Sequence, residues 1–297
     1  MASDLTNAQA GSIARQLGWE APSVEVQPVA GGDTSPTFIL RGPRQKAFVK
    51  IAPSATADLL LAEADGLEAL AAANSVRVPE LLALGVFDEW GGHFLALEAL
   101  ELRSRCRACD HALGGQLALL HSKLGARYGW RRDNYLGTTL QKNSVDEKWA
   151  RFFLEQRLEP QMKVYLSAHP ELEQQDLLNE LKHSWLGIGA EHHPEPALLH
   201  GDLWAGNAAS LPDQTPVIFD PAVHFGDREC DLAMADLFGG YTDAFFSAYQ
   251  NAWPLPPGWQ NRRGFYQLYH LLNHANLFGG SYELSVKNQV ERLLKLN

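Results

Sequence analysis

The chain is 297 residues long, which corresponds to about two average domains or to one larger protein with two lobes. Hydrophobic residues make up 45% of it and charged residues 20%, so the composition indicates a globular protein with a sizeable core and excludes a disordered chain. With 25 basic and 35 acidic side chains the formal net charge is −10, which disfavours nucleic acids and anionic membranes as partners.

The first hundred residues predict a small antiparallel sheet with one helix. Short β-type runs at 23–29, 37–41, 46–52, 79–88 and 92–100 are separated by turn residues such as Gly91 and Gly92. Residues 57–73 interrupt these runs with strong helix formers and with leucines at helical spacing. We therefore expect a helix packed on the sheet, and for the first twenty residues no more than a further helix on the same lobe.

The remainder of the chain predicts a mainly helical lobe. Helical patterns cover 111–122, 146–166, 171–189 and 261–278, while two short apolar runs, 197–202 and 216–221, form a β-like island between them. We found no internal repeat. The sequence thus predicts an α+β protein with a strand-rich lobe at 1–100 and a helix-rich lobe at 101–297.

The sequence lacks the features typical of membrane, secreted and disulfide-rich proteins, and of metal sites built from cysteine and histidine. No uncharged apolar run approaches the roughly 18 residues that a membrane-spanning helix needs, and the start lacks the pattern of a secretory signal. Three cysteines cannot form a disulfide framework, the C-x-x-C of Cys106 and Cys109 is isolated, and His192 and His193 have no third ligand at metal spacing. We expect a cytoplasmic protein that binds neither membranes nor nucleic acids.

The strongest local motif is His200-Gly201-Asp202-Leu203-Trp204-Ala205-Gly206-Asn207, which has the H-x-D-x-x-x-x-N spacing of kinase catalytic loops. Phosphoryl transfer needs a carboxylate that accepts the proton of the acceptor hydroxyl, and oxygen ligands that hold Mg²⁺ on the phosphates. Asp202 suits the first role, and Asn207 together with Asp220 at the end of an apolar run suits the second. Taken alone, the HGD sequence is more often a buried turn in which Asp202 caps a backbone amide, and the other residues of the set shift the balance towards catalysis.

The first lobe offers the cation that such chemistry requires. Lys50 ends the run Ala47-Phe48-Val49, and Glu63 follows thirteen residues later on the predicted helix, so the two are expected to form an ion pair that anchors the nucleotide phosphates. A solvated lysine and a helix-surface glutamate are the alternative.

Two further segments are candidates for nucleotide contacts. Gly31 and Gly32 would let the backbone approach the phosphates, although a glycine pair is equally a hairpin turn. The run from Ala96 to Leu100, with Glu98 and Leu100 as the expected contacts, lies where the lobes join and could hydrogen-bond an adenine edge. A plain edge strand is the alternative.

These motifs together resemble the fructosamine kinase (ketosamine 3-kinase) family, a branch of the aminoglycoside phosphotransferase and choline kinase type of protein-kinase-like fold. The resemblance covers roughly residues 24–283 and rests on the motif around Lys50, the helix with Glu63, HGDLWAGN, and the segments 128–143, 220–240 and 268–282. It implies a bilobal protein-kinase-like fold in which 1–100 bind the nucleotide and 101–297 supply catalysis and the acceptor site.

The resemblance also implies an activity. The enzyme would transfer the γ-phosphate of ATP, with Mg²⁺, to the C3 hydroxyl of a small-molecule ketosamine or of a glycated lysine in a protein, and the product would then release the amine. Asp202 matches the base, Asn207 and Asp220 the metal ligands, and Lys50 with Glu63 the nucleotide clamp. Four residues fall in motifs near the acceptor side, and structural packing or ion pairing is the alternative role for each: Trp204, Asp227, Arg228 and Asp231.

Other acceptors remain open at this stage, because an aminoglycoside, choline or sugar kinase would share the same catalytic residues. The C-terminal segment holds only Glu283 and Glu291 as acids, which argues against an aminoglycoside site. A non-catalytic nucleotide-binding protein is a further alternative, and the intact catalytic set argues against it. The oligomeric state does not follow from the sequence.

Overall fold

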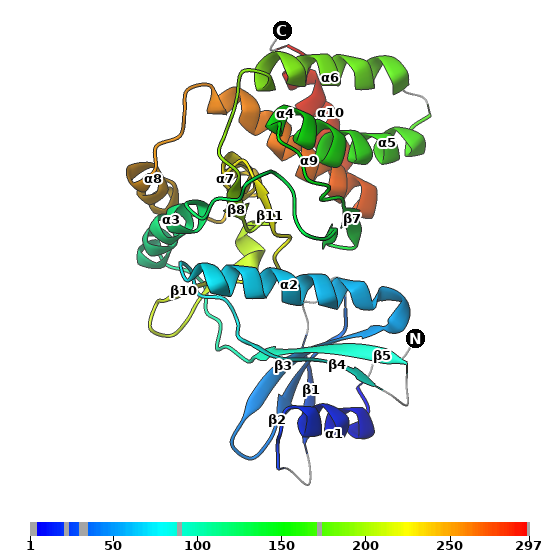
Figure 1. Ribbon diagram of the computed structural model, residues 1–297, viewed down its shortest axis with the longest axis vertical. Coiled ribbons are helices and arrows are strands. Elements are labelled where there is room, and N and C mark those ends of the chain that lie inside the picture. Colours follow the sequence, from blue (N-terminus) through cyan, green and yellow to red (C-terminus); the bar gives the residue numbers. More distant parts are fainter. Residues whose placement is uncertain (1–4, 21–23, 30–34, 88–90, 171–173, 296–297) are drawn as a thin grey trace.

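The computed structural model describes residues 5–20, 24–29, 35–87, 91–170 and 174–295. Figure 1 shows two lobes, a small one built on a sheet and a larger helical one, with the helix α2 lying between them. This confirms the predicted α+β architecture with a strand-rich first part and a helix-rich second part.

The first lobe is a five-stranded antiparallel sheet with the strand order β1-β2-β3-β5-β4. Its elements are α1 (Asn7–Gln16), β1 (Glu25–Val29), β2 (Thr37–Arg41), β3 (Lys46–Pro53), α2 (Ala57–Ala73), β4 (Leu81–Phe87) and β5 (Gly92–Glu98). One sheet face packs with α1 around Phe38, Val49 and Phe94, and the other packs with α2. The expected N-terminal helix on this lobe is therefore confirmed, and the helix predicted at 57–73 has the same bounds in the structure.

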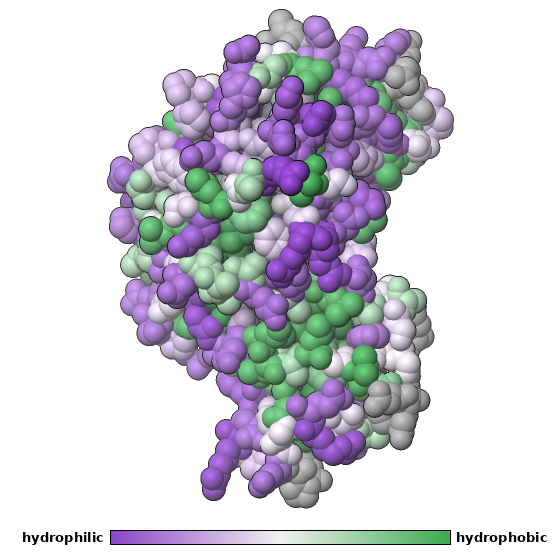
Figure 2. Space-filling model, viewed as in Figure 1, coloured by the Kyte–Doolittle hydropathy of each residue, from purple (hydrophilic) through white to green (hydrophobic). Residues whose placement is uncertain are grey.

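The edge strand β4 exposes every second one of its apolar side chains. Leu82, Leu84 and Val86 are exposed on this edge strand. Figure 2 shows apolar surface on the first lobe, where Figure 1 places α2 and the β4–β5 edge.

The second lobe contains eight described helices and three pairs of short strands. The helices are α3 (Arg107–His121), α4 (Trp149–Phe153), α5 (Glu159–Ala168), α6 (Gln174–Gly189), α7 (Glu229–Leu237), α8 (Asp243–Ala252), α9 (Trp259–Phe278) and α10 (Ser281–Leu294). The strands are β6 (Asn134–Leu136), β7 (Thr139–Gln141), β8 (Ala197–Leu199), β9 (Ala208–Ser210), β10 (Pro216–Ile218) and β11 (His224–Gly226), paired as β6–β7, β8–β11 and β9–β10.

Two features of this lobe differ from the sequence-based expectation. The helix predicted at 146–166 is divided, because a π-helical turn at Leu154–Leu158 separates α4 from α5. The hairpin β6–β7 and the helices α7, α8 and α10 were not predicted. The two strands have three residues each, and α7 and α8 have nine and ten, so their apolar patterns are short, whereas α10 carries Val286, Val290 and Leu293 at helical spacing.

The connection between the lobes runs from the end of β5 at Glu98 to the start of α3 at Arg107, and the predicted boundary at 100/101 falls within it. A hydrophobic cluster bridges the lobes: Leu60, Leu67 and Leu95 of the first lobe pack with Leu117 and Ile218 of the second. No described helix is both long and apolar enough to cross a membrane.

Candidate functional site

A pocket of about 410 Å³ lies between the two lobes. Its walls come from both lobes, and they include six of the residues that the sequence predicts for the site: Lys50, Glu63, Asp202, Trp204, Asn207 and Asp220. The fold thus brings together groups that are up to 170 positions apart in the chain.

Lys50 is the central cation of this pocket. Its buried Nζ lies 2.8 Å from Oε1 and 2.9 Å from Oε2 of Glu63, and 2.7 Å from Oδ1 of Asp220. Burial lowers the pKa of Lys50, but the carboxylates of Glu63 and Asp220 outweigh this effect and raise the pKa above its usual value. The ammonium group is therefore protonated and fixed, as a phosphate anchor requires. The predicted Lys50–Glu63 ion pair is present.

The side chain of Asp231 holds the backbone at the start of the catalytic-loop motif. Its Oδ2 accepts a hydrogen bond of 2.7 Å from the backbone N–H of His200, and its Oδ1 accepts one of 2.8 Å from Gly201. Gly201 has φ +83°, and a Cβ at this position would lie 2.1 Å from the carbonyl oxygen of Ala222, so only glycine fits the turn. This anchoring places Asp202 in the pocket.

Asp202 has the properties of a proton acceptor near neutral pH. Burial and the neighbouring Asp220 carboxylate raise the pKa of Asp202 to about 7, although a hydrogen bond from Asn207 opposes the shift. The amide Nδ2 of Asn207 donates to Oδ2 of Asp202 over 3.1 Å and to its backbone oxygen over 2.9 Å. Because Nδ2 makes these bonds, Oδ1 is the atom that Asn207 can offer to a cation.

Asp220 offers a second oxygen-bearing side chain to a cation. It follows β10 and has φ +57°, a left-handed conformation that is uncommon for a residue other than glycine and typical of strained functional positions. Its side chain is 46% exposed and faces the pocket. One carboxylate and one amide oxygen, completed by phosphate oxygens and water, match the oxygen set that Mg²⁺ prefers, so the residues present fit this ion.

Trp204 forms part of the pocket wall opposite the first lobe. Its side chain is 38% exposed, and its ring covers Gly206, where a Cβ would lie 2.2 Å from the indole. Gly206 therefore creates the space that the indole occupies beside the pocket.

The other predicted nucleotide contacts, Glu98, Leu100, Gly31 and Gly32, are not among the described residues that line the pocket. Glu98 ends β5, where Oε2 pairs with Arg77 and accepts from the N–H of Glu80 over 3.3 Å, and Leu100 is half-buried in the connection between the lobes. Neither is among the described residues that line the pocket, and adenine binding by their backbone stays a prediction. Gly31 and Gly32 lie outside the described residues.

The other three residues predicted for the acceptor side are buried and have protein partners. Asp231 holds the loop, while Arg228 donates to the backbone oxygens of Trp253 over 2.9 Å and of Pro254 over 2.6 Å. Asp227 accepts from His192 over 2.7 Å and from Tyr266 over 2.6 Å. These contacts support the structural alternative, and none of the three lines the pocket among its described residues.

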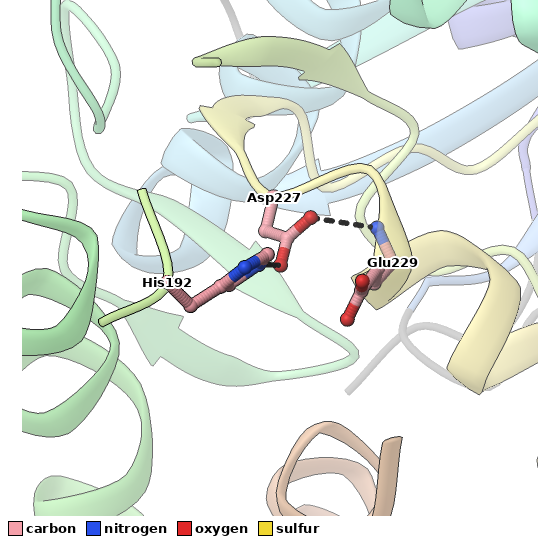
Figure 3. A group of neighbouring side chains, drawn as sticks. All are labelled: His192, Asp227 and Glu229. Atoms are coloured by element: carbon pink, nitrogen blue, oxygen red, sulfur yellow. Dashed lines mark hydrogen bonds and ion pairs between the residues drawn. The ribbon is translucent and has the colours of Figure 1, made fainter. Parts of the chain in front are cut away.

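His192 and Asp227 also form a group with Glu229 (Figure 3), in which the potential ligand atoms lie within 4.8 Å of one another. The sequence showed no third ligand near His192 because the two acids follow more than thirty residues later. Glu229 accepts from Arg262 over 2.9 Å and 2.7 Å, which neutralises its carboxylate, and Asp227 accepts hydrogen bonds from His192 and Tyr266. The contacts identify an ion-pair network that holds α7 and α9 together.

Sequence reasoning missed several pocket residues. Ser35, Leu59, Tyr135 and Gly137 line the pocket, the last two from the hairpin β6–β7. Tyr135 belongs to the segment 128–143 that helped to identify the family resemblance, and that segment was the available signal for its position.

Comparison with known proteins supports the same interpretation. The family model for fructosamine kinase matches residues 5–296. A probable ketoamine kinase from Synechocystis sp. is 39% identical over 273 residues, which cover 92% of this chain and 91% of that protein. A crystal structure of a protein assigned as a fructosamine-3-kinase from Haemophilus somnus has a TM-score of 0.85 at 29% identity and covers 96% of each chain. At the level of the fold alone, the chain is similar to a choline kinase from Streptococcus pneumoniae, with a TM-score of 0.62 at 13% identity, covering 98% of this chain and all of that one.

Proposed function

The chain belongs to the fructosamine kinase family, and from this premise we propose that it transfers the γ-phosphate of ATP to the C3 hydroxyl of a ketosamine. The acceptor would be a fructosamine or ribulosamine carried by a small amine or by a lysine side chain. The observation that carries the proposal is the pocket in which Asp202, Asn207 and Asp220 of one lobe face the Lys50–Glu63 pair of the other.

Asp202 acts as the proton acceptor in this scheme. The C3 oxygen attacks the γ-phosphorus, the bond between that phosphorus and the oxygen of the leaving ADP breaks, and the hydroxyl proton passes to the Asp202 carboxylate. A raised pKa suits this role, because a carboxylate with a pKa near 7 is a stronger base than an ordinary aspartate and is about half ionised at neutral pH.

Lys50 provides the positive charge for the transferred phosphate. Its Nζ is held by Glu63 and Asp220, so it requires little reorganisation when the phosphates enter. Asn207 and Asp220 would hold Mg²⁺, which when bound neutralises phosphate charge.

Release of the amine completes the proposed function. Elimination of the 3-phosphate from the product would leave an imine between sugar and amine, and hydrolysis of that imine by water would release the amine, so the net result would be deglycation. We also propose a cytoplasmic location, which the three free cysteines and the use of ATP support.

The test is an ATP-dependent phosphorylation assay read by phosphorus NMR. The acceptor panel contains fructosyl-lysine, ribulosyl-lysine, choline, an aminoglycoside and simple sugars, and unglycated lysine serves as the matched control. We expect a new phosphate resonance at C3 of one or both ketosamines, followed by release of lysine. Turnover of choline, an aminoglycoside or a free sugar in place of the ketosamines would contradict the proposed acceptor, and nucleotide binding without turnover of any acceptor would indicate a non-catalytic protein.

A further inference from the structure

The helix α2 presents carboxylates to both lobes. Glu63 lies on the side that faces the sheet and binds Lys50. Asp58 and Asp65 are seven residues, or two helical turns, apart, and so they share one helix face. This face is turned to the second lobe, because the partners of both aspartates come from that lobe. Figure 1 shows α2 between the sheet and the β6–β7 region.

Asp65 makes two close contacts with the second lobe. Its Oδ2 accepts a hydrogen bond of 2.6 Å from the indole N–H of Trp130, and its Oδ1 accepts one of 2.7 Å from Nε of Arg131. The Asp65 side chain is only 15% exposed. Charge-assisted bonds in a partly buried setting are stronger than surface ion pairs, so this contact fixes the middle of the helix.

Asp58 repeats the arrangement two turns earlier. Its Oδ2 accepts from the hydroxyl of Tyr135 over 3.0 Å, and its Oδ1 pairs with the guanidinium group of Arg132. We call the six residues that make these contacts the interlobe latch: Asp58, Asp65, Trp130, Arg131, Arg132 and Tyr135.

The second-lobe half of the latch is attached to the segment that follows Asp220. The side-chain amide of Asn134 donates to the backbone oxygen of Val223 over 2.7 Å, and the rings of Trp130 and Phe225 lie 5.4 Å apart. On α2, a Cβ at Gly66 would lie 3.0 Å from Pro221, which shows how closely the helix approaches the same segment. The latch therefore connects the helix that carries Glu63 with the segment that carries Asp220.

We propose that the interlobe latch holds α2 in the orientation that points Glu63 at Lys50, so that the nucleotide clamp is assembled before any substrate binds. This inference rests on the proposed function, because it assigns the clamp to ATP. The latch residues are positioning residues: they act on the nucleotide through Glu63 and Lys50. The physical basis is that a helix fixed at two points along one face cannot rotate or move outward without breaking both contacts.

The first experiment measures the Kd of Mg-ATP by calorimetry, without any acceptor. Trp130→Phe removes the indole N–H and keeps an aromatic ring against Phe225, and Asp65→Asn removes the charge and keeps one acceptor oxygen. We expect each variant to raise the Kd by about 2- to 30-fold, the range for coupling through packed networks. Glu68→Gln is the matched control, because it changes the same charge on an exposed position of α2 and should leave the Kd unchanged.

The second experiment separates positioning from a purely structural role. Trp130→Phe and Asp65→Asn are repeated in a Glu63→Gln background, where the clamp is already impaired. If the latch acts through Glu63, neither change raises the Kd further, whereas a structural defect would add its full effect. Wild-type affinity in both single variants, or full additivity in the double variants, would overturn the latch proposal.

The two proposals fail in different ways. A wild-type protein that binds Mg-ATP and phosphorylates a ketosamine, with latch variants of unchanged affinity, would leave the proposed function intact and refute the latch. A wild-type protein without affinity for Mg-ATP would refute the proposed function and the latch with it. If Asp65→Asn fails to fold, Trp130→Phe still decides the matter, because it removes one hydrogen bond and preserves the ring.

Discussion

Asp202 and Asp220 are two carboxylates of one pocket in very different surroundings. Burial, together with the charge of Asp220, raises the pKa of Asp202, while Asp220 is nearly half exposed and paired with Lys50. The spacing of the motif indicated Asp202 as a candidate, and the end of an apolar run indicated Asp220. Neither pattern could predict the surroundings that make Asp202 a better base, because those depend on groups distant in the chain.

Replacing Asp202 with asparagine tests the base directly. Asp202→Asn keeps the size and one oxygen but removes the proton acceptor, so we expect kcat to fall by about 10²- to 10⁴-fold with little change in nucleotide affinity. The measurement is steady-state kinetics together with calorimetric titration of Mg-ATP. A kcat close to that of the wild type would show that another group accepts the proton.

His270 is a buried histidine that should make the stability of the protein sensitive to acid. Burial, with a smaller effect of His274, lowers the pKa of His270 from 6.5 to about 3. The unfolded chain therefore binds a proton between pH 6.5 and 3 that the folded protein does not, and stability falls as the pH drops through this window.

The variant His270→Leu should reduce this dependence. We expect the slope of unfolding free energy against pH, measured by urea titration between pH 7 and 5, to decrease by up to about 1 kcal/mol per pH unit. His111→Leu, at an exposed position, is the control and should keep the wild-type slope. An unchanged slope in His270→Leu would show that His270 is not held neutral.

At the level of the elements, the sequence pattern predicted those helices and strands whose own residues determine their conformation. The helix at 57–73 has its predicted bounds because its helix formers and apolar spacing agree with its packing. The strands β6 and β7 have three residues each, too few for a period to be visible, so the hairpin that brings Tyr135 to the pocket could not be predicted. Likewise, the roles of Asp231 and Asp227 depend on backbone and side-chain donors from distant segments.

The packing of α3 on α8 offers a test at this scale. Gly114 and Gly115 are neighbours in α3, but a Cβ at Gly114 would lie 2.2 Å from the carbonyl oxygen of Phe245, whereas the described atoms leave the space beside Gly115 open to 4 Å. We expect Gly114→Ala to destabilise the protein by about 1–3 kcal/mol through overpacking.

Gly115→Ala is its matched control and should stabilise the protein by about 0.5–1 kcal/mol, since alanine has the higher helix propensity. Urea unfolding of the two variants beside the wild type gives both values. Equal effects of the two substitutions would contradict the close approach of α8 to Gly114.

At the scale of the whole molecule, the two lobes are joined by more than the chain connection. The hydrophobic cluster around Leu60, Leu117 and Ile218 and the interlobe latch both link α2 to the second lobe. The sequence predicted the two lobes. It did not predict the contacts between them, because the cluster and the interlobe latch combine residues from segments that are far apart in the chain.

A ligand in the interlobe pocket should therefore stabilise the entire protein. At a concentration of one hundred times its Kd, Mg-ATP would add about 2.7 kcal/mol to the free energy of unfolding. We expect Mg-ATP to raise the Tm of the wild type, EDTA to abolish most of the increase, and Asp220→Ala to show none.

The control for this measurement is Glu291→Ala, an exposed acid on α10, which should retain the full increase. An Asp220→Ala protein with the wild-type increase in Tm would contradict the role of Asp220 as a ligand of the cation.

The position of Trp204 has a practical consequence. Among the described tryptophans it is the exposed one, and it borders the pocket, while Trp149 and Trp185 are fully buried in the helical lobe. Its indole should therefore emit at longer wavelength than those of the core, and a small quencher such as iodide should reach it first. A ligand that binds in the pocket against this ring would shield it, so protection of Trp204 from iodide would report occupancy of the pocket, independent of any phosphate transfer.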